Sequence, residues 1–132
     1  MTPSLTQLDH LVLTVRDIDA TVAFYTRVLG MTSARFTAAD GTTRWALKFG
    51  RQKINLHAAA APFEPKAGSI QPGSADLCFL SDTGLADWQR HFADLAVDVL
   101  DGPVQRTGAA GPILSIYIRD PDGNLIEVSN AL

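Results

Sequence analysis

A pattern of predicted secondary structure occurs twice in this chain. The first 61 residues indicate a strand, a helix and three further strands, and the same order returns after residue 73. The two copies share few identical residues, so the order of the elements indicates the repeat. The pattern predicts an α+β protein built from two βαβββ modules. We expect one domain over residues 1–132, with module 1 at 8–61, a linker at 62–73 and module 2 at 74–130.

Glycine, proline and aspartate mark the expected ends of the elements. Asp40-Gly41 predicts a hairpin turn, because both residues tolerate positive backbone angles. The stretch 120–124, Asp-Pro-Asp-Gly-Asn, predicts a tight turn before the last strand. Three prolines between residues 62 and 73 lack the N–H that a strand would use, which favours a linker there. After the second helix we expect two short strands, at residues 97–100 and 104–107.

The composition excludes several classes of protein. With 11 Lys and Arg against 14 Asp and Glu, the net charge is -3, so the basic excess that nucleic acid binding requires is missing. Cys78 is the single cysteine and cannot form an internal disulfide. No stretch approaches the roughly 20 apolar residues of a membrane span, and no targeting segment is expected. These features predict a cytoplasmic protein with a small-molecule partner rather than nucleic acid or a membrane.

Four titratable residues fall at corresponding places in the repeat. Aligning the modules places His10 with Asp76 on the first strands, and His57 with Glu127 on the last strands. A buried imidazole or carboxylate costs several kcal/mol unless it is paired or coordinated. Imidazole and carboxylate groups brought together from both modules would bind a divalent metal ion, with zinc, iron(II), manganese, nickel and cobalt all suited to such ligands.

Each of these residues also has a purely structural interpretation. A histidine in a strand is commonly a core or edge residue, Glu127 could face solvent, and Asp76 could hydrogen-bond the preceding turn. His91 is expected to be a solvated residue of the second helix. Only three histidines occur, and His10 and His57 lie at matched ends of one repeat, so we favour the interpretation as metal ligands.

Several motifs together resemble those of one known family. They are Leu8–Val15, Phe24-Tyr25, Val28–Met31, and Asp120–Asn124 leading to Glu127. These motifs resemble the vicinal oxygen chelate superfamily, which includes glyoxalase I, extradiol ring-cleaving dioxygenases, fosfomycin-resistance thiol transferases and bleomycin-binding proteins. The resemblance extends from Leu8 to Ser129 and is strongest to small members of the glyoxalase domain-containing protein 5 type.

The resemblance implies a fold and a set of ligands. The fold is two paired βαβββ modules forming a curled mixed sheet around a metal ion, commonly in a homodimer. His10 matches the histidine ligand of the first strand, and Glu127 matches the glutamate ligand of the last strand. His57 stands at a position that resembles a glutamate ligand of glyoxalase I, and Asp76 at one that resembles a histidine ligand. The types of ligand that the family uses, two imidazoles and a carboxylate, are therefore present, but they stand at different positions.

The resemblance and the residues together suggest a metal-dependent enzyme. Its substrate would chelate the ion through adjacent oxygen atoms, in a glyoxalase-like or a ring-cleaving reaction. Glu127, or Asp76, would serve as the base. Arg44 or Arg119 could bind an anionic substrate. The alternative is a non-catalytic protein that sequesters a drug or metabolite, as bleomycin-binding relatives do. Expected substrate-binding residues, for which core packing is the competing interpretation, are Trp45, Phe49, Asn55 and Tyr117.

Overall fold

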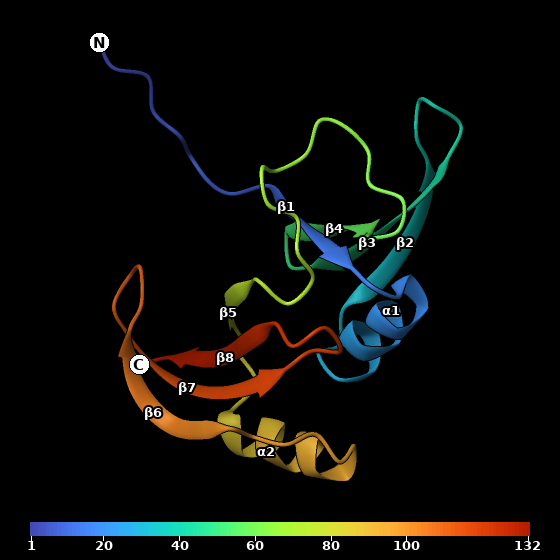
Figure 1. Cartoon of the computed structure of the whole chain (residues 1–132). Helices are drawn as coiled ribbons and strands as arrows, with labels where there is room; N and C mark the ends of the chain where they lie inside the picture. The colour runs from blue at the N-terminus through green and yellow to red at the C-terminus, as the bar shows by residue number, and fades with distance from the viewer. The chain divides into compact units, whose positions relative to one another are not determined.

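Each half of the chain forms a four-stranded mixed sheet with one helix (Figure 1). The structure, a computed structural model, describes all residues from 1 to 132. The chain divides into unit 1, Met1–Gln71, and unit 2, Pro72–Leu132. Both units have the order strand, helix and three strands, so the predicted α+β fold of two βαβββ modules is confirmed. Neither helix has the length and apolar character that crossing a membrane requires.

Unit 1 has the strand order β1-β4-β3-β2. The first strand pairs with the last in parallel, and the other pairs are antiparallel. Asp17 begins the helix, because its carboxylate accepts a hydrogen bond from the backbone N–H of Ala20. The elements of unit 1 are β1 (His10–Val15), α1 (Ile18–Arg27), β2 (Thr32–Thr37), β3 (Thr43–Phe49) and β4 (Gln52–Ala58).

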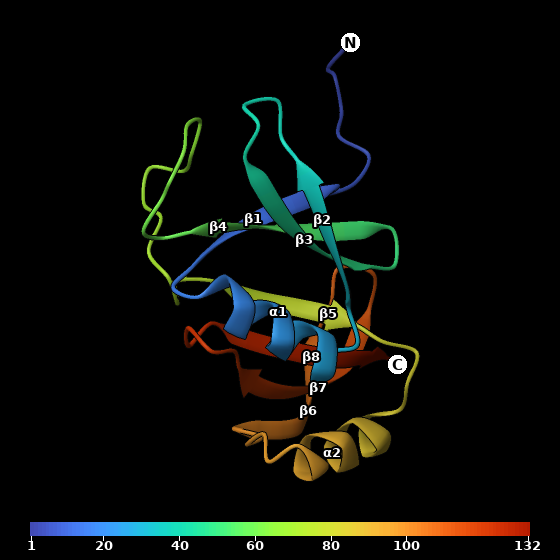
Figure 2. The ribbon, with the colours of Figure 1, turned by 90° about the vertical axis from the view of Figure 1, so that its right-hand side faces the viewer.

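Unit 2 repeats this topology with the strand order β5-β8-β7-β6. Again the first strand pairs with the last in parallel. The helix lies against the sheet and contacts its last strand (Figure 2). The elements of unit 2 are β5 (Asp76–Leu80), α2 (Leu85–Asp94), β6 (Asp101–Thr107), β7 (Pro112–Arg119) and β8 (Leu125–Ala131). Of the two short strands expected at 97–100 and 104–107, the second is the end of β6, whereas residues 97–100 lie in no strand. The register of β6 with β7 shifts between Asp101 and Val104.

Alternating side chains give each sheet an apolar face and a more polar face. In unit 1 the apolar face includes the buried side chains of Val15, Leu47, Ile54 and Leu56, and Tyr25 of α1 is also buried. In unit 2 the apolar face includes the buried Ile116, Ile118, Ile126 and Val128, and Phe92 of α2 is also buried. Because successive residues of a strand point to opposite sides, their neighbours in sequence lie on the second face, which we call the helix-free face.

The predicted turn at residues 120–124 joins β7 to β8 and ties β5 to them. The Asp120 carboxylate accepts hydrogen bonds from the backbone N–H groups of Asp122 and Asn124, both at 2.9 Å. The Asn124 side chain donates to Asp120 at 2.8 Å and accepts from the Ala75 N–H at 2.8 Å. Asn124 is 1% exposed, so these bonds are made away from water. One amide thus links the turn to the start of β5.

Replacing Asn124 by alanine is expected to destabilise the protein. The substitution removes both side-chain hydrogen bonds and leaves the partly buried Ala75 N–H without its acceptor, a loss of about 2 kcal/mol in the free energy of unfolding. Urea denaturation of Asn124→Ala measures the loss. The control Gln105→Ala, on the exposed side of β6, should stay within about 0.5 kcal/mol of the wild type. Equal stability of the two variants would contradict this account of the turn.

Candidate functional site

Glu127 is the central charged residue on the helix-free face of unit 2. Its neighbours in sequence, Ile126 and Val128, are buried on the apolar face, so the carboxylate points to the other side of the sheet. Strand pairing places Cys78 of β5 on one side of Glu127 and Tyr117 of β7 on the other. Glu127 therefore has a thiol and a phenol as its cross-strand neighbours.

Two serines hold the Glu127 carboxylate. The Ser115 hydroxyl donates a hydrogen bond to Glu127 Oε2 at 2.5 Å, and the Ser129 hydroxyl lies 3.4 Å from the same oxygen. The two hydroxyls are 2.7 Å apart, and Cys78 Sγ lies 3.3 Å from Ser129 Oγ. Both serine contacts are made to Oε2, and the Cys78 thiol also interacts with the Glu127 carboxylate.

Arg106 is a second charged residue on this face. Its Nε donates to the Tyr117 hydroxyl at 3.0 Å, and its guanidinium nitrogen Nη2 lies 3.9 Å from the Asp101 carboxylate. An arginine can only donate hydrogen bonds, so the Tyr117 oxygen accepts and the hydroxyl hydrogen remains available. Arg106 is not among the site residues predicted from the sequence.

Two hollows on unit 2 share Arg106 and Glu127. One has a volume of about 550 Å³ and the other about 370 Å³. The larger is bounded by the loop between β6 and β7 and by apolar side chains of β5, β7 and the C-terminus, including Leu80, Ile113 and Leu132. The smaller includes Asp76, Asp101, Tyr117 and Leu125. A small molecule in either hollow would lie beside both an acidic and a basic group.

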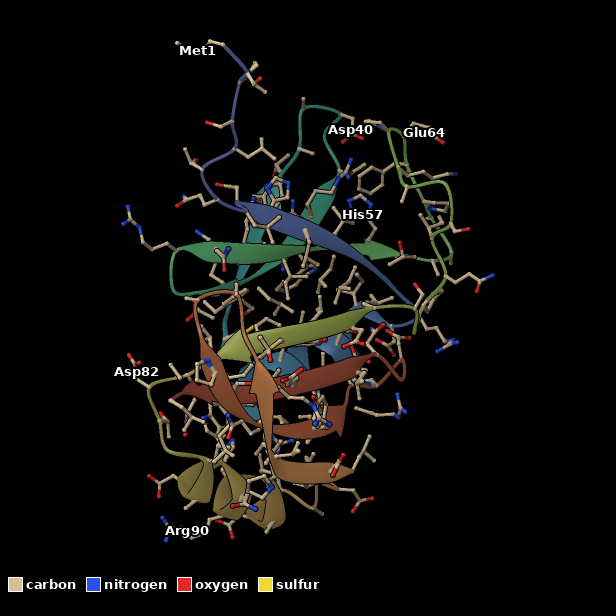
Figure 3. The ribbon with its side chains drawn as sticks, turned by 90° about the vertical axis from the view of Figure 1, so that its left-hand side faces the viewer. Met1, Asp40, His57, Glu64, Asp82 and Arg90 are labelled. Atoms are coloured by element: carbon tan, nitrogen blue, oxygen red, sulfur yellow. The ribbon has the colours of Figure 1, made fainter.

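His57 of unit 1 lies in an aromatic and cationic cluster rather than beside a carboxylate. Its ring packs against Phe63 with centroids 3.9 Å apart and the ring planes inclined by 39°. The Arg44 guanidinium carbon lies 3.2 Å from the centre of the same Phe63 ring. Arg44 in turn forms an ion pair with Asp40 at 2.9 Å (His57 and Asp40 are labelled in Figure 3). Burial, and secondarily the positive charge of Arg44, hold the pKa of the His57 imidazole below its ordinary value of 6.5.

His10 and Asn55 lie on the helix-free face of unit 1. His10 Nδ1 is 2.8 Å from the Asp9 carboxylate, and the ring is substantially exposed. Asn55 Oδ1 is buried and has no hydrogen-bond partner. A buried carbonyl oxygen without a donor is uncommon and marks a position where a ligand or ion could supply the missing contact.

Strand pairing changes one correspondence inferred from the sequence. When His10 is superposed on Asp76, Val12 of β1 corresponds to Cys78 of β5. Val12 pairs with Asn55, whereas Cys78 pairs with Glu127. Asn55 is therefore the counterpart of Glu127, and His57 is the counterpart of Ser129. The expected alignment of His57 with Glu127 is wrong by two residues. A shift of two preserves the face of the sheet, so His57 still lies on the helix-free face.

The four expected substrate-binding residues do not share one face. Asn55 and Tyr117 lie on the helix-free faces of units 1 and 2. Trp45 pairs with the buried Leu56, and both Trp45 and Phe49 point to the apolar side of β3. Trp45 also packs against Arg35, whose guanidinium carbon lies 5.4 Å from the ring centre.

The expected metal ligands are distributed over both units. His10 and His57 belong to unit 1, and Asp76 and Glu127 belong to unit 2. Asp76 begins β5 and is exposed on the same face as Glu127. Neither unit gathers three or more His, Cys, Asp or Glu side chains in a group that could hold a metal ion. The arginines expected to bind an anion have local partners, because Arg44 binds Asp40 and Arg119 donates to the Gly123 carbonyl.

Comparison with known proteins gives matches over almost the whole chain. Residues 7–128 match the family described as the Glyoxalase/Bleomycin resistance protein/Dioxygenase superfamily. The chain is 56% identical over 127 residues to the glyoxalase domain-containing protein RDO1 of Mycosarcoma maydis, covering 96% of this chain and 69% of that protein.

Solved structures agree with this match. The integron cassette protein VCH_CASS1 of V. cholerae is 55% identical, with a TM-score of 0.93 and 100% of both chains covered. The lactoylglutathione lyase of Agrobacterium tumefaciens is 27% identical, with a TM-score of 0.70, 97% of this chain and 96% of that chain covered.

The environment of His57 predicts how its pKa responds to substitution. Removing the covering ring in Phe63→Ala should raise the pKa toward 6.5, and Arg44→Gln should raise it by a smaller amount, because burial is the larger cause. NMR titration of the imidazole measures both shifts. Arg35→Gln, on the opposite face of the sheet, is the control and should leave the His57 pKa unchanged.

The same shift has a consequence for stability. Since the folded-state pKa lies below the ordinary value, the unfolded chain binds the proton more readily, and the contribution of His57 to stability decreases as the pH falls from 6.5 through the lower folded-state pKa. This loss should be smaller in Phe63→Ala. An unchanged His57 pKa in Phe63→Ala would contradict the assignment of burial as the main cause.

Proposed function

Because the chain belongs to the Glyoxalase/Bleomycin resistance protein/Dioxygenase superfamily, we propose that it is a metal-dependent enzyme. Its substrate is a small molecule with two adjacent oxygen atoms, and its reaction is of the glyoxalase or the ring-cleaving type. The observation that carries the proposal is the Glu127 carboxylate. It borders two hollows, and both of its serine contacts are made through one oxygen, Oε2.

The donor atoms on the helix-free faces suit a divalent ion. Imidazole nitrogens and carboxylate oxygens are ligands that zinc, iron(II), manganese, nickel and cobalt all accept. The Asn55 Oδ1, buried without a donor, adds an oxygen that a cation would satisfy. The proposed ligands are His10, His57, Asp76 and Glu127. A bound ion would act as a Lewis acid toward oxygen atoms of the substrate.

Residues of unit 2 supply the base, the hydrogen-bond donor and the positive charge of the proposed reaction. Glu127 Oε1, or Asp76, accepts the proton that the substrate loses. Tyr117 donates its hydroxyl hydrogen to a substrate oxygen, since Arg106 already donates to the hydroxyl oxygen. Arg106 adds positive charge beside both hollows, where negative charge develops on the substrate. We also propose that the protein acts in the cytoplasm as a homodimer.

A second candidate function is sequestration of a drug or metabolite without chemistry. The observation that favours it is the larger hollow, whose volume of about 550 Å³ is enclosed chiefly by apolar side chains and by the loop between β6 and β7. Such a surface suits a planar apolar ligand.

Metal titration distinguishes the two functions. The metal-free protein should bind about one equivalent of zinc, nickel, manganese or iron(II). His10→Ala and Glu127→Gln should each weaken the affinity by about 10-fold or more, because each removes a ligand. His91→Ala, on α2, is the matched control and should bind as the wild type does. Calorimetry measures each affinity. A wild-type protein that binds none of these ions would favour the sequestering function.

A substrate screen tests the reaction. Hemithioacetals, α-hydroxy ketones, and catechols with oxygen are the compounds to assay with the metal-loaded protein. For any compound that reacts, Glu127→Gln should lower kcat by about 100-fold or more, the usual contribution of a general base. Trp88→Phe, on α2, should leave kcat unchanged. Turnover that survives in Glu127→Gln would remove this residue from the mechanism.

A further inference from the structure

We propose that Ser115 and Ser129 are positioning residues that hold Glu127 Oε2 and so direct Oε1 toward the two hollows. The inference rests on the proposed function, in which Glu127 binds a metal ion and accepts a proton. Neither serine borders a hollow, so both would act through the carboxylate alone.

Both serines are completely buried, at 0% exposure. A hydroxyl taken out of water costs free energy unless it finds a hydrogen-bond partner. The partners available to Ser115 and Ser129 are each other, Cys78 and Glu127. The pair therefore depends on the carboxylate for its hydrogen bonds, and the position of the carboxylate depends on the pair.

The direction of the hydrogen bonds can be derived from the chemistry of the groups. A carboxylate only accepts, so the Ser115 hydrogen points to Glu127 Oε2 at 2.5 Å. The Ser115 oxygen then accepts from Ser129 at 2.7 Å. The Ser129 oxygen in turn accepts from the Cys78 thiol at 3.3 Å. Ser129 has a single hydrogen, so while it donates to Ser115 its longer contact of 3.4 Å with Oε2 adds little, and Ser129 acts on the carboxylate through Ser115.

Strand pairing gives this arrangement its rigidity. Ser115 and Ser129 are direct partners on the antiparallel pair β7–β8, and Glu127 is two residues before Ser129 on the same face. The donors are therefore attached to two backbone strands rather than to a loop. A carboxylate held at one oxygen in this way has few rotamers left, and its second oxygen has a fixed direction.

A graded series of variants tests the inference in two ways. The variants are Cys78→Ala, Ser129→Ala and Ser115→Ala, which remove successive members of the hydrogen-bonded chain that ends at Glu127 Oε2. Ser115→Thr retains the hydroxyl, and Ser33→Ala on β2 is the matched control. The first readout is the position of the Glu127 carboxylate in crystal structures of the metal-free variants. The second is Co²⁺ affinity, measured by titration through the visible absorption of the ion.

The expected results follow the order of the series. Ser115→Ala should displace the carboxylate by more than about 0.5 Å and weaken Co²⁺ binding by about 10- to 100-fold. Ser129→Ala should have a smaller effect, Cys78→Ala should stay within about threefold of the wild type, and Ser115→Thr should recover most of the affinity. Ser33→Ala should equal the wild type.

Two results would overturn the inference. One is a Glu127 carboxylate that keeps its place in Ser115→Ala. The other is wild-type Co²⁺ affinity in both serine variants, even if their thermal stability falls. If the wild type itself binds no Co²⁺, the metal dependence of the proposed function is wrong, and the crystal structures alone decide whether the serines position Glu127.

Discussion

The pairing of β8 with β5 and β7 determines which side chains surround Glu127. It places Cys78 on one side of the carboxylate and Tyr117 on the other. The same pairing buries Ile126 and Val128 on the apolar face, and this burial fixes the register. A slip by one residue would exchange the two faces, bring the carboxylate into the core and expose both apolar side chains, at a cost of several kcal/mol. The polar site on one face thus depends on apolar packing on the other.

Much of this face could be predicted from the sequence, because one turn sets the register of β7 with β8. Pairs on the two strands lie at equal distances from Asp122, as Tyr117 and Glu127 do, and as Ser115 and Ser129 do. The turn at 120–124 was predicted, so the two serines beside Glu127 could have been found by counting outward from it. Alternation along each strand likewise separates the helix-free face from the core.

The position of Arg106 and the counterpart of Glu127 in unit 1 depend on strand pairing that the local sequence pattern does not specify. Arg106 reaches the site because β6 continues through Gly102, where φ is +96° and an added Cβ would lie 2.2 Å from the Ser115 carbonyl oxygen. Gly and Pro at 102–103 interrupt the strand pattern, which is why the predicted strand began at residue 104 rather than at Asp101. The correspondence of Asn55 with Glu127 has a similar origin. Parallel pairing of the first and last strands is set by the helix and the strands between them, and loop lengths do not reveal it.

The two units use one topology for different chemistry. In unit 1 the His57 ring is covered by Phe63 and lies near the Arg44 cation, so its pKa is lowered and the neutral imidazole is favoured. In unit 2, Glu127 is held by hydroxyl hydrogens, which a carboxylate accepts. One unit therefore presents an uncharged nitrogen donor, and the other presents an anionic oxygen. A neutral imidazole can accept a hydrogen bond or bind a cation through its free nitrogen, whereas a carboxylate only accepts and carries negative charge, so the same strand positions present different chemistry in the two units.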